Sequence, residues 1–145
     1  MIQLRTSGKE AWTPTEKDTP YQRLGGSEAV KALVDTFYDI MEAEEPALLA
    51  THKLDEAGKV SRDLRDKVAL YLIGWMGGPQ DYTETHGHPR LRMRHAHVPV
   101  DTTFRDAWMR AMNKAMDQLK VQSPVREFLD ERLTDLADHL RNRPG

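Results

Sequence analysis

A histidine surrounded by cationic side chains follows a glycine-rich stretch in the middle of the chain. The sequence is interrupted by Gly77-Gly78-Pro79, and soon afterwards comes the run Gly87-His88-Pro89-Arg90-Leu91-Arg92-Met93-Arg94-His95. An imidazole can ligate iron, and guanidinium groups can pair with the carboxylates of haem propionates. The residue types in this run are therefore those that a protein would use to hold a haem.

Two further segments carry aromatic side chains with a polar atom. One contains Phe37-Tyr38, and the other contains Trp108, thirteen positions after His95. A buried phenol or indole N–H needs a hydrogen-bond acceptor, which a diatomic ligand with partial negative charge would supply. Aromatic residues on helical stripes are more often simple core residues, so the pattern alone leaves both roles open.

In this combination and order, the residues resemble the group II truncated haemoglobins, the two-over-two globins that are common in bacteria. The resemblance covers most of the chain and is most specific between Trp75 and Trp108. It implies an all-α truncated globin, a two-over-two helical sandwich enclosing haem b (iron protoporphyrin IX). We expect residues 1–20 to form a flexible N-terminal extension and residues 21–145 to form the truncated globin domain.

Composition agrees with one small domain. The chain of 145 residues is long enough for a core or a cofactor pocket. Its formal net charge of −2 gives no positive field for nucleic acid or an anionic membrane, so we expect neither as a partner. The absence of cysteine excludes thiolate ligands and leaves His, Tyr or Met for iron. No apolar run has the length of a signal peptide or membrane span, so we predict a cytoplasmic protein.

Helical periodicity occurs four times, and convincing strand alternation occurs nowhere. We predict a first core helix capped by Ser27 and a second capped by Ser61, which ends at Gly77-Gly78-Pro79. Between these helices, the sequence predicts a turn-rich piece from Pro46 to Lys53 and a surface loop over residues 54–60.

The second half of the chain begins with a connection that we expect to be irregular up to about Pro89. Long connections of this kind commonly border a ligand. Asp101 is expected to cap a third core helix, and Ser123-Pro124 to begin the last one. The two antiparallel helix pairs would then sandwich whatever lies between them.

The resemblance implies that His95 is the proximal ligand of the iron. We expect Leu91, four positions earlier on the same helical face, to pack under the imidazole, and Arg92 and Arg94 to meet carboxylates. For either arginine alone, a solvated surface position is an equal alternative. A metal-bound imidazole normally donates its second N–H to a carbonyl or carboxylate, and the sequence does not identify that acceptor.

Four histidines within twelve residues, His86, His88, His95 and His97, raise zinc binding as an alternative. Against it, His88 lies in a Gly-His-Pro turn that the resembled family shares, so we expect a structural role for this residue. At positions 97 and 98 the family often has Pro and Phe, whereas this chain has His97 and Val98. The proximal wall is therefore expected to differ, with His97 bonding a propionate or facing water.

On the distal side, the resemblance assigns ligand hydrogen bonds to Tyr38 and Trp108 and places His52 at the distal edge. An exposed loop histidine is an equal alternative for His52, because the loop over residues 53–60 is longer than in typical members. These three residues would also carry the chemistry if the protein is an enzyme.

The apolar contacts of the haem are expected from both halves of the chain. Leu64 and Val68, four apart on the second core helix, would face the ligand, and Leu72, Val98 and Phe104 complete the contacts that the resemblance implies. Because positions 64 and 68 are both apolar, distal polarity must come from other elements.

The implied function is reversible binding of O₂ and other diatomic ligands at a His-ligated b-type haem. One interpretation is an enzyme with NO-dioxygenase or peroxidase-type activity, which a reductase would serve as partner. A second is non-catalytic transport, storage, scavenging or sensing of O₂, NO, CO or sulfide. A third is a helical interaction domain without haem. For the oligomeric state, we expect a monomer or a weak homodimer.

Overall fold

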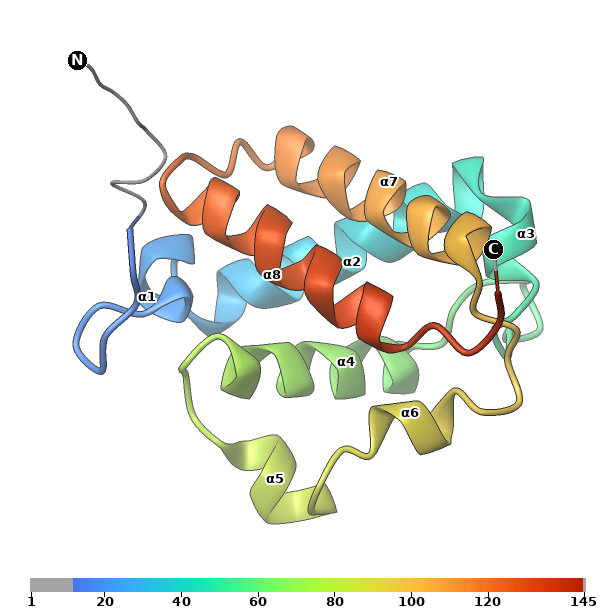
Figure 1. Cartoon of the computed structure of the whole chain (residues 1–145), viewed down its shortest axis with the longest axis horizontal. Coiled ribbons are helices and arrows are strands. Elements are labelled where there is room, and N and C mark those ends of the chain that lie inside the picture. The colour runs from blue at the N-terminus through green and yellow to red at the C-terminus, as the bar shows by residue number, and fades with distance from the viewer. Residues whose placement is uncertain (1–11, 145) are drawn as a thin grey trace.

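The computed structural model describes residues 12–144, and within them it contains eight helices and no strand (Figure 1). This confirms the predicted all-α class. None of the helices in the described range is long and apolar enough to cross a membrane.

Four long helices form the body of the molecule. They are α2 (Ser27–Glu44), α4 (Arg62–Trp75), α7 (Thr102–Gln118) and α8 (Val125–His139). α2 contacts both α4 and α7, and α7 contacts α8. The members of each pair, α2 with α4 and α7 with α8, run in opposite directions (Figure 1). Each long helix has one apolar stripe that faces its neighbours. The side chains buried deepest between them include Leu33, Phe37, Met41, Met112, Met116, Leu129 and Leu133.

The predicted caps hold at two of three helix starts. The Ser61 hydroxyl accepts the Leu64 N–H at 3.2 Å, and the Asp101 carboxylate accepts the Phe104 N–H at 2.8 Å. The Ser27 cap was wrong, because α2 already includes Ser27 and Gly26 stands at the cap position without a side-chain bond. The Ser27 hydroxyl instead lies 2.9 Å from the Tyr21 hydroxyl.

Four short helices complete the fold: α1 (Pro20–Leu24), α3 (Pro46–Leu49), α5 (Asp81–His86) and α6 (Leu91–Arg94). α5 corrects the prediction of an irregular connection up to Pro89. Its Tyr82 is 5% exposed, and the ring packs edge-on against Tyr71 of α4 with centroids 5.6 Å apart. This contact with a distant element supplies the burial that the polar sequence of α5 does not predict.

The corner after α4 depends on two glycines. Gly77 has a φ of +96°, the left-handed stop that the sequence predicts. A Cβ on Gly78 would lie 2.6 Å from the Tyr21 ring, and the Tyr21 N–H donates to the Met76 carbonyl at 3.0 Å. The missing side chain at Gly78 therefore lets α1 approach the end of α4.

Residues 12–20, which the sequence placed in a flexible extension, make specific contacts. The Trp12 ring packs edge-on against Phe128 of α8 with centroids 5.4 Å apart, and the indole N–H donates to Asp18 at 2.9 Å. Asp18 also accepts from Arg23, and these two bonds, that of Arg23 first, lower the pKa of the Asp18 carboxyl to about 2. Residues 1–11 of the predicted extension lie outside the described part of the chain.

Candidate functional site

A cavity of about 370 Å³ lies between the helix pairs, a size typical of small-molecule sites. We refer to it as the central cavity. Ten of the twelve predicted cofactor and ligand residues line it: Tyr38, His52, Leu64, Val68, Leu72, Leu91, Arg94, His95, Phe104 and Trp108. Arg92 and Val98 do not. Side chains that are far apart in the sequence thus converge on one space, as the resemblance implies.

The half-buried imidazole of His95 lies at the end of α6 and has a defined orientation. Its Nδ1 atom is 2.7 Å from the carbonyl oxygen of Leu91. A carbonyl can only accept a hydrogen bond, so Nδ1 carries the proton and the lone pair lies on Nε2. Leu91 is thus the acceptor that the sequence did not identify. This is the arrangement in which histidine commonly binds a metal.

The chain after His95 is fastened to the C-terminal segment by Asn142. The Asn142 amide donates to the carbonyls of His95 at 3.0 Å and Val98 at 2.9 Å, and it accepts the Val100 N–H at 2.9 Å. Val98 lies in the turn after His95, whereas Val100, 1% exposed, lines the central cavity. The predicted place of Val98 in the wall is therefore taken by Val100.

The two predicted propionate arginines have different positions. The Arg92 guanidinium donates to the His139 carbonyl at 2.9 Å, at the C-terminal end of α8, where a cation is favourable. Arg92 thus links α6 to α8 and does not line the cavity. Arg94 lines the cavity at an exposed position, and its Nε donates to the Pro89 carbonyl at 2.6 Å.

The other histidines of this region do not gather around His95. His97 is exposed and does not line the central cavity. His88 accepts the Arg90 N–H at 3.0 Å, which agrees with its predicted structural role, and His86 packs against Tyr82. Within residues 12–144, no group of three or more His, Asp or Glu side chains is arranged to hold a metal ion. The zinc alternative therefore has no support in the described geometry.

Two hydrogen-bond donors line the central cavity from α2 and α7. Tyr38 is 4% exposed, and burial raises the pKa of its phenol to about 12, which the charge of Arg65 partly opposes. Phe37 packs against both rings, with centroids 4.9 Å from Tyr38 and 5.0 Å from Trp108. In the described range, neither the phenol nor the indole N–H has a hydrogen-bond partner. Both donors are therefore available to a molecule in the cavity.

His52 lines the same cavity and is half-buried, so it is not the exposed loop residue of the alternative interpretation. Its ring lies edge-on to Tyr38 with centroids 5.9 Å apart, and its Nδ1 is 3.0 Å from the Leu48 carbonyl. Burial lowers the pKa of His52, an effect that the bond to the Leu48 carbonyl opposes. The imidazole is thus neutral at pH 7, with its lone pair on Nε2.

Several lining residues were missed by the sequence reasoning. Lys67 and Tyr71 lie on α4 within one turn of Val68, so the helical stripe that indicated Leu64 and Val68 could have indicated them too. Burial, with a smaller contribution from Tyr82, raises the pKa of Tyr71. Further lining residues come from α2, α5, α7, α8 and its C-terminal end: Val34, Phe37, Tyr82, Met112, Leu136, Ala137 and Leu140.

The donor set suits a flat, largely apolar cofactor with a metal at its centre. His95 offers one imidazole nitrogen, the walls are mostly apolar, and Tyr38 and Trp108 offer an O–H and an N–H group that have no partner among residues 12–144. Haem combines these requirements, since it needs an axial ligand, apolar contacts and polar groups near its distal position. The residues present in the central cavity therefore fit haem.

The helical sandwich and this cavity are those of a globin. Residues 19–142 match the family model described as bacterial-like globin. The match covers most of the chain, so the chain belongs to the bacterial-like globin family. Membership of this family implies that the cofactor is haem and that small gaseous molecules are its ligands.

Within that family, the similar proteins are group II truncated haemoglobins. The chain is 37% identical over 126 residues to group 2 truncated haemoglobin YjbI of Bacillus subtilis, covering 87% of this chain and 90% of that protein. The crystal structure of the Bacillus anthracis group II truncated haemoglobin superposes with a TM-score of 0.79 at 35% identity, over 92% of this chain and 96% of the other. The truncated oxygen-avid haemoglobin from Bacillus subtilis gives a TM-score of 0.76 at 38% identity, over 86% and 98%. These similarities confirm both the resemblance and the two-over-two fold.

Proposed function

We propose that this protein binds O₂ and other diatomic ligands such as NO reversibly at a b-type haem in the central cavity. The observation that carries the proposal is that one cavity is lined by His95, with its lone pair on Nε2, and by Tyr38 and Trp108, two donors without a hydrogen-bond partner in the described part of the chain. The oxygen-avid haemoglobin from Bacillus subtilis, 38% identical, supports the choice of O₂.

The residues would divide the work as follows. Nε2 of His95 holds the iron, while the Leu91 carbonyl keeps the ring in one orientation and increases its basicity. Arg94, which lines the cavity, would meet a propionate. Tyr38 and Trp108 donate hydrogen bonds to a polar ligand and slow its release. The haem, when bound, supplies the coordination position at which a diatomic ligand binds.

Peroxidase-type activity is a second candidate, and one observation favours it. The His52 imidazole lines the cavity beside Tyr38 and is neutral, so its Nε2 can accept a proton and return it. A group with these properties assists cleavage of a peroxide. If this function is correct, His52→Phe lowers the rate of peroxide turnover while leaving O₂ binding intact.

Absorption spectroscopy of purified protein tests the first proposal. A Soret band is expected in the wild type and in His97→Ala, because His97 is exposed and away from the cavity. His95→Ala should lose haem or its characteristic ferrous spectrum. If His95→Ala keeps normal haem occupancy and a native ferrous spectrum, the ligand assignment is wrong. A purified wild type that binds no haem would overturn the proposed function as a whole.

A further inference from the structure

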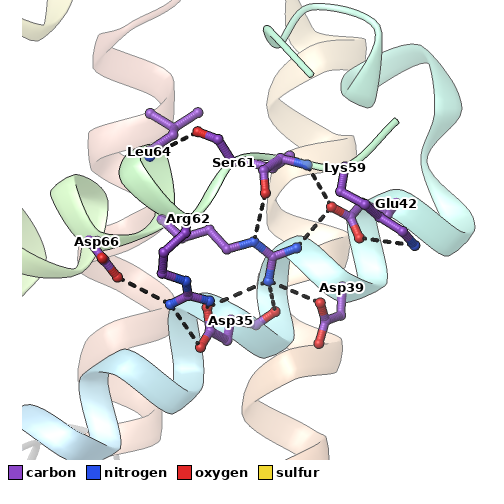
Figure 2. Close-up of polar contacts among 10 residues, drawn as sticks. Asp35, Asp39, Glu42, Lys59, Ser61, Arg62, Leu64 and Asp66 are labelled. Atoms are coloured by element: carbon purple, nitrogen blue, oxygen red, sulfur yellow. Dashed lines mark hydrogen bonds and ion pairs between the residues drawn. The ribbon is translucent and has the colours of Figure 1, made fainter. Parts of the chain in front are cut away.

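A charged side chain is buried directly behind the central cavity. Arg65 follows Leu64 on α4, its side chain is 8% exposed, and it does not line the cavity. Its guanidinium group donates hydrogen bonds to α2 and to the Val60 carbonyl just before α4, and the α2 acceptors Asp35, Asp39 and Glu42 are labelled in Figure 2. Burial of a charge is unfavourable unless the charge is paired and hydrogen-bonded, so the surroundings of Arg65 indicate what it stabilises.

Every nitrogen of the Arg65 guanidinium has a partner (Figure 2). Nε donates to the Val60 carbonyl at 3.1 Å, one terminal nitrogen to the Asp35 carbonyl at 3.1 Å and the Asp39 carboxylate at 2.9 Å, and the other to Glu42 at 2.8 Å. Because the guanidinium is planar and rigid, these bonds fix its position. The group is therefore a stationary positive charge between α2 and α4.

This fixed charge faces the aromatic ring of Tyr38. The Arg65 Cζ atom lies 5.6 Å from the centre of the ring, within the range of a cation–π interaction. The Tyr38 phenol lines the cavity, whereas Arg65 does not reach it. The ring thus connects a cation outside the cavity to a hydroxyl group on its wall, and the positive charge partly offsets the rise in the pKa of that hydroxyl that burial causes.

We propose that Arg65 is a positioning residue for ligand binding, which holds the Tyr38 ring and strengthens its phenol as a hydrogen-bond donor toward the ligand. This inference rests on the proposed function, because it requires a ligand in the cavity. Arg65 acts on that ligand only through Tyr38. A purely structural role for Arg65 would leave the donor strength of the phenol unchanged.

The test compares Arg65→Met with Arg62→Met in the haem-loaded protein. Arg62 is the matched control, since it also pairs with Asp35, is 58% exposed and contacts Asp66 on its own helix. Arg65→Met should accelerate O₂ dissociation by about three- to tenfold and raise the C–O stretching frequency of the CO complex, because the positive field at the ligand weakens. Arg62→Met should leave the rate and the frequency at the wild-type values.

A second variant, Asp39→Asn, keeps the fold and should change the rate of O₂ dissociation in the opposite direction. Asp39 is 68% exposed and accepts from Arg65, and Asn keeps an oxygen at the same place without its negative charge. Asp39→Asn should therefore slow O₂ dissociation by roughly twofold, because less of the Arg65 charge is neutralised. A structural role predicts faster dissociation in both variants. Faster dissociation in Asp39→Asn would overturn the proposal, even if Arg65→Met does not fold.

The Tyr38→Phe background separates this inference from the proposed function. Arg65→Met should have no further effect on dissociation once the phenol is absent. If Tyr38→Phe accelerates dissociation but Arg65→Met adds its full effect in both backgrounds, Arg65 does not act through Tyr38 and the inference is wrong. If Tyr38→Phe leaves the rate of O₂ dissociation unchanged, the proposed role of Tyr38 as a hydrogen-bond donor to the ligand is wrong. Absence of haem from the wild type would mark failure of the proposed function instead.

Discussion

At the scale of the residue, two histidines use the same local device. His52 and His95 each place Nδ1 against the carbonyl oxygen four residues earlier, at 3.0 Å and 2.7 Å. Each follows a four-residue helix, and the last carbonyls of a helix have no partner within it. Both imidazoles are thereby held as the tautomer with the lone pair on Nε2. On each side of the cavity, one short helix thus supplies the carbonyl that orients the histidine after it.

A first prediction concerns the two distal donors. Tyr38→Phe and Trp108→Phe should each accelerate O₂ dissociation by about tenfold or more, since a hydrogen bond to a strongly polar acceptor contributes on the order of 1.5–3 kcal/mol. Stopped-flow or flash photolysis measures the rates. If both donors share one ligand oxygen, the effects in the double variant will not add. Unchanged rates in both single variants would mean that the two side chains only pack.

A second prediction uses the lowered pKa of His52. Burial stabilises the neutral imidazole, so the pKa of His52 lies below its usual value of 6.5. The ring is therefore uncharged at pH 7 and becomes protonated only at lower pH. Azide or cyanide binding to the ferric protein should therefore change in a step at a pH below 6.5. His52→Phe should remove that step while conserving ring volume. Identical pH profiles for the two proteins would show that His52 does not affect the ligand.

At the scale of the element, sequence periodicity predicted the long helices because each has a stripe of apolar residues and a clear start or stop. α2, α4, α7 and α8 all lie where the pattern placed them. α5 has one buried residue, Tyr82, and five other residues with no apolar stripe. α5 is stabilised by its contact with α4, so no local sequence pattern predicts this helix. Sequence reasoning therefore succeeded where burial is periodic and failed where one distant contact decides.

A third prediction concerns the corner between α4 and α5. Gly78→Ala should lower the free energy of unfolding by about 1–3 kcal/mol, because the new methyl group would overlap the Tyr21 ring and force α1 away. Gly58→Ala is the comparison, since its φ is +77° but a Cβ there meets nothing within 4 Å. That variant should show only backbone strain, about 1 kcal/mol. Denaturant unfolding measures both, and equal losses would refute a close-approach role for Gly78.

At the scale of the whole molecule, the proximal side is assembled from segments that are far apart in the sequence. Asn142 bonds to residues 42–47 positions earlier, and Arg92 bonds to the end of α8. Neither contact could be predicted from the sequence. A single Asn after the last helix belongs to no recognisable motif, and the position of Arg92, three residues before His95, suggested a propionate partner instead. The candidate ligand His95 could be singled out from the sequence because a whole motif surrounds it.

A fourth prediction follows from that arrangement. Asn142→Ala removes three hydrogen bonds around the chain after His95, and a partner left unsatisfied costs about 1–3 kcal/mol. We expect faster loss of haem, measured by its transfer to an excess of a haem-scavenging apoprotein. Arg143→Ala is the matched control, because Arg143 is exposed and, among residues 12–144, its side chain bonds only to the neighbouring Asn142. Equal haem loss in the two variants would mean that Asn142 does not support the proximal side.

The bonds of Asn142 also have a consequence for the order in which the molecule is completed during synthesis. Ribosomes make the chain from its N-terminus, so α2, α4 and the segment with His95 emerge before residue 142 does. Until Asn142 has emerged, the carbonyls of His95 and Val98 cannot receive its amide. Tyr38, His52 and Trp108 all precede residue 142, so the opposite wall of the cavity does not depend on these bonds. The bonds that fasten the segment after His95 therefore form only once residue 142 is available.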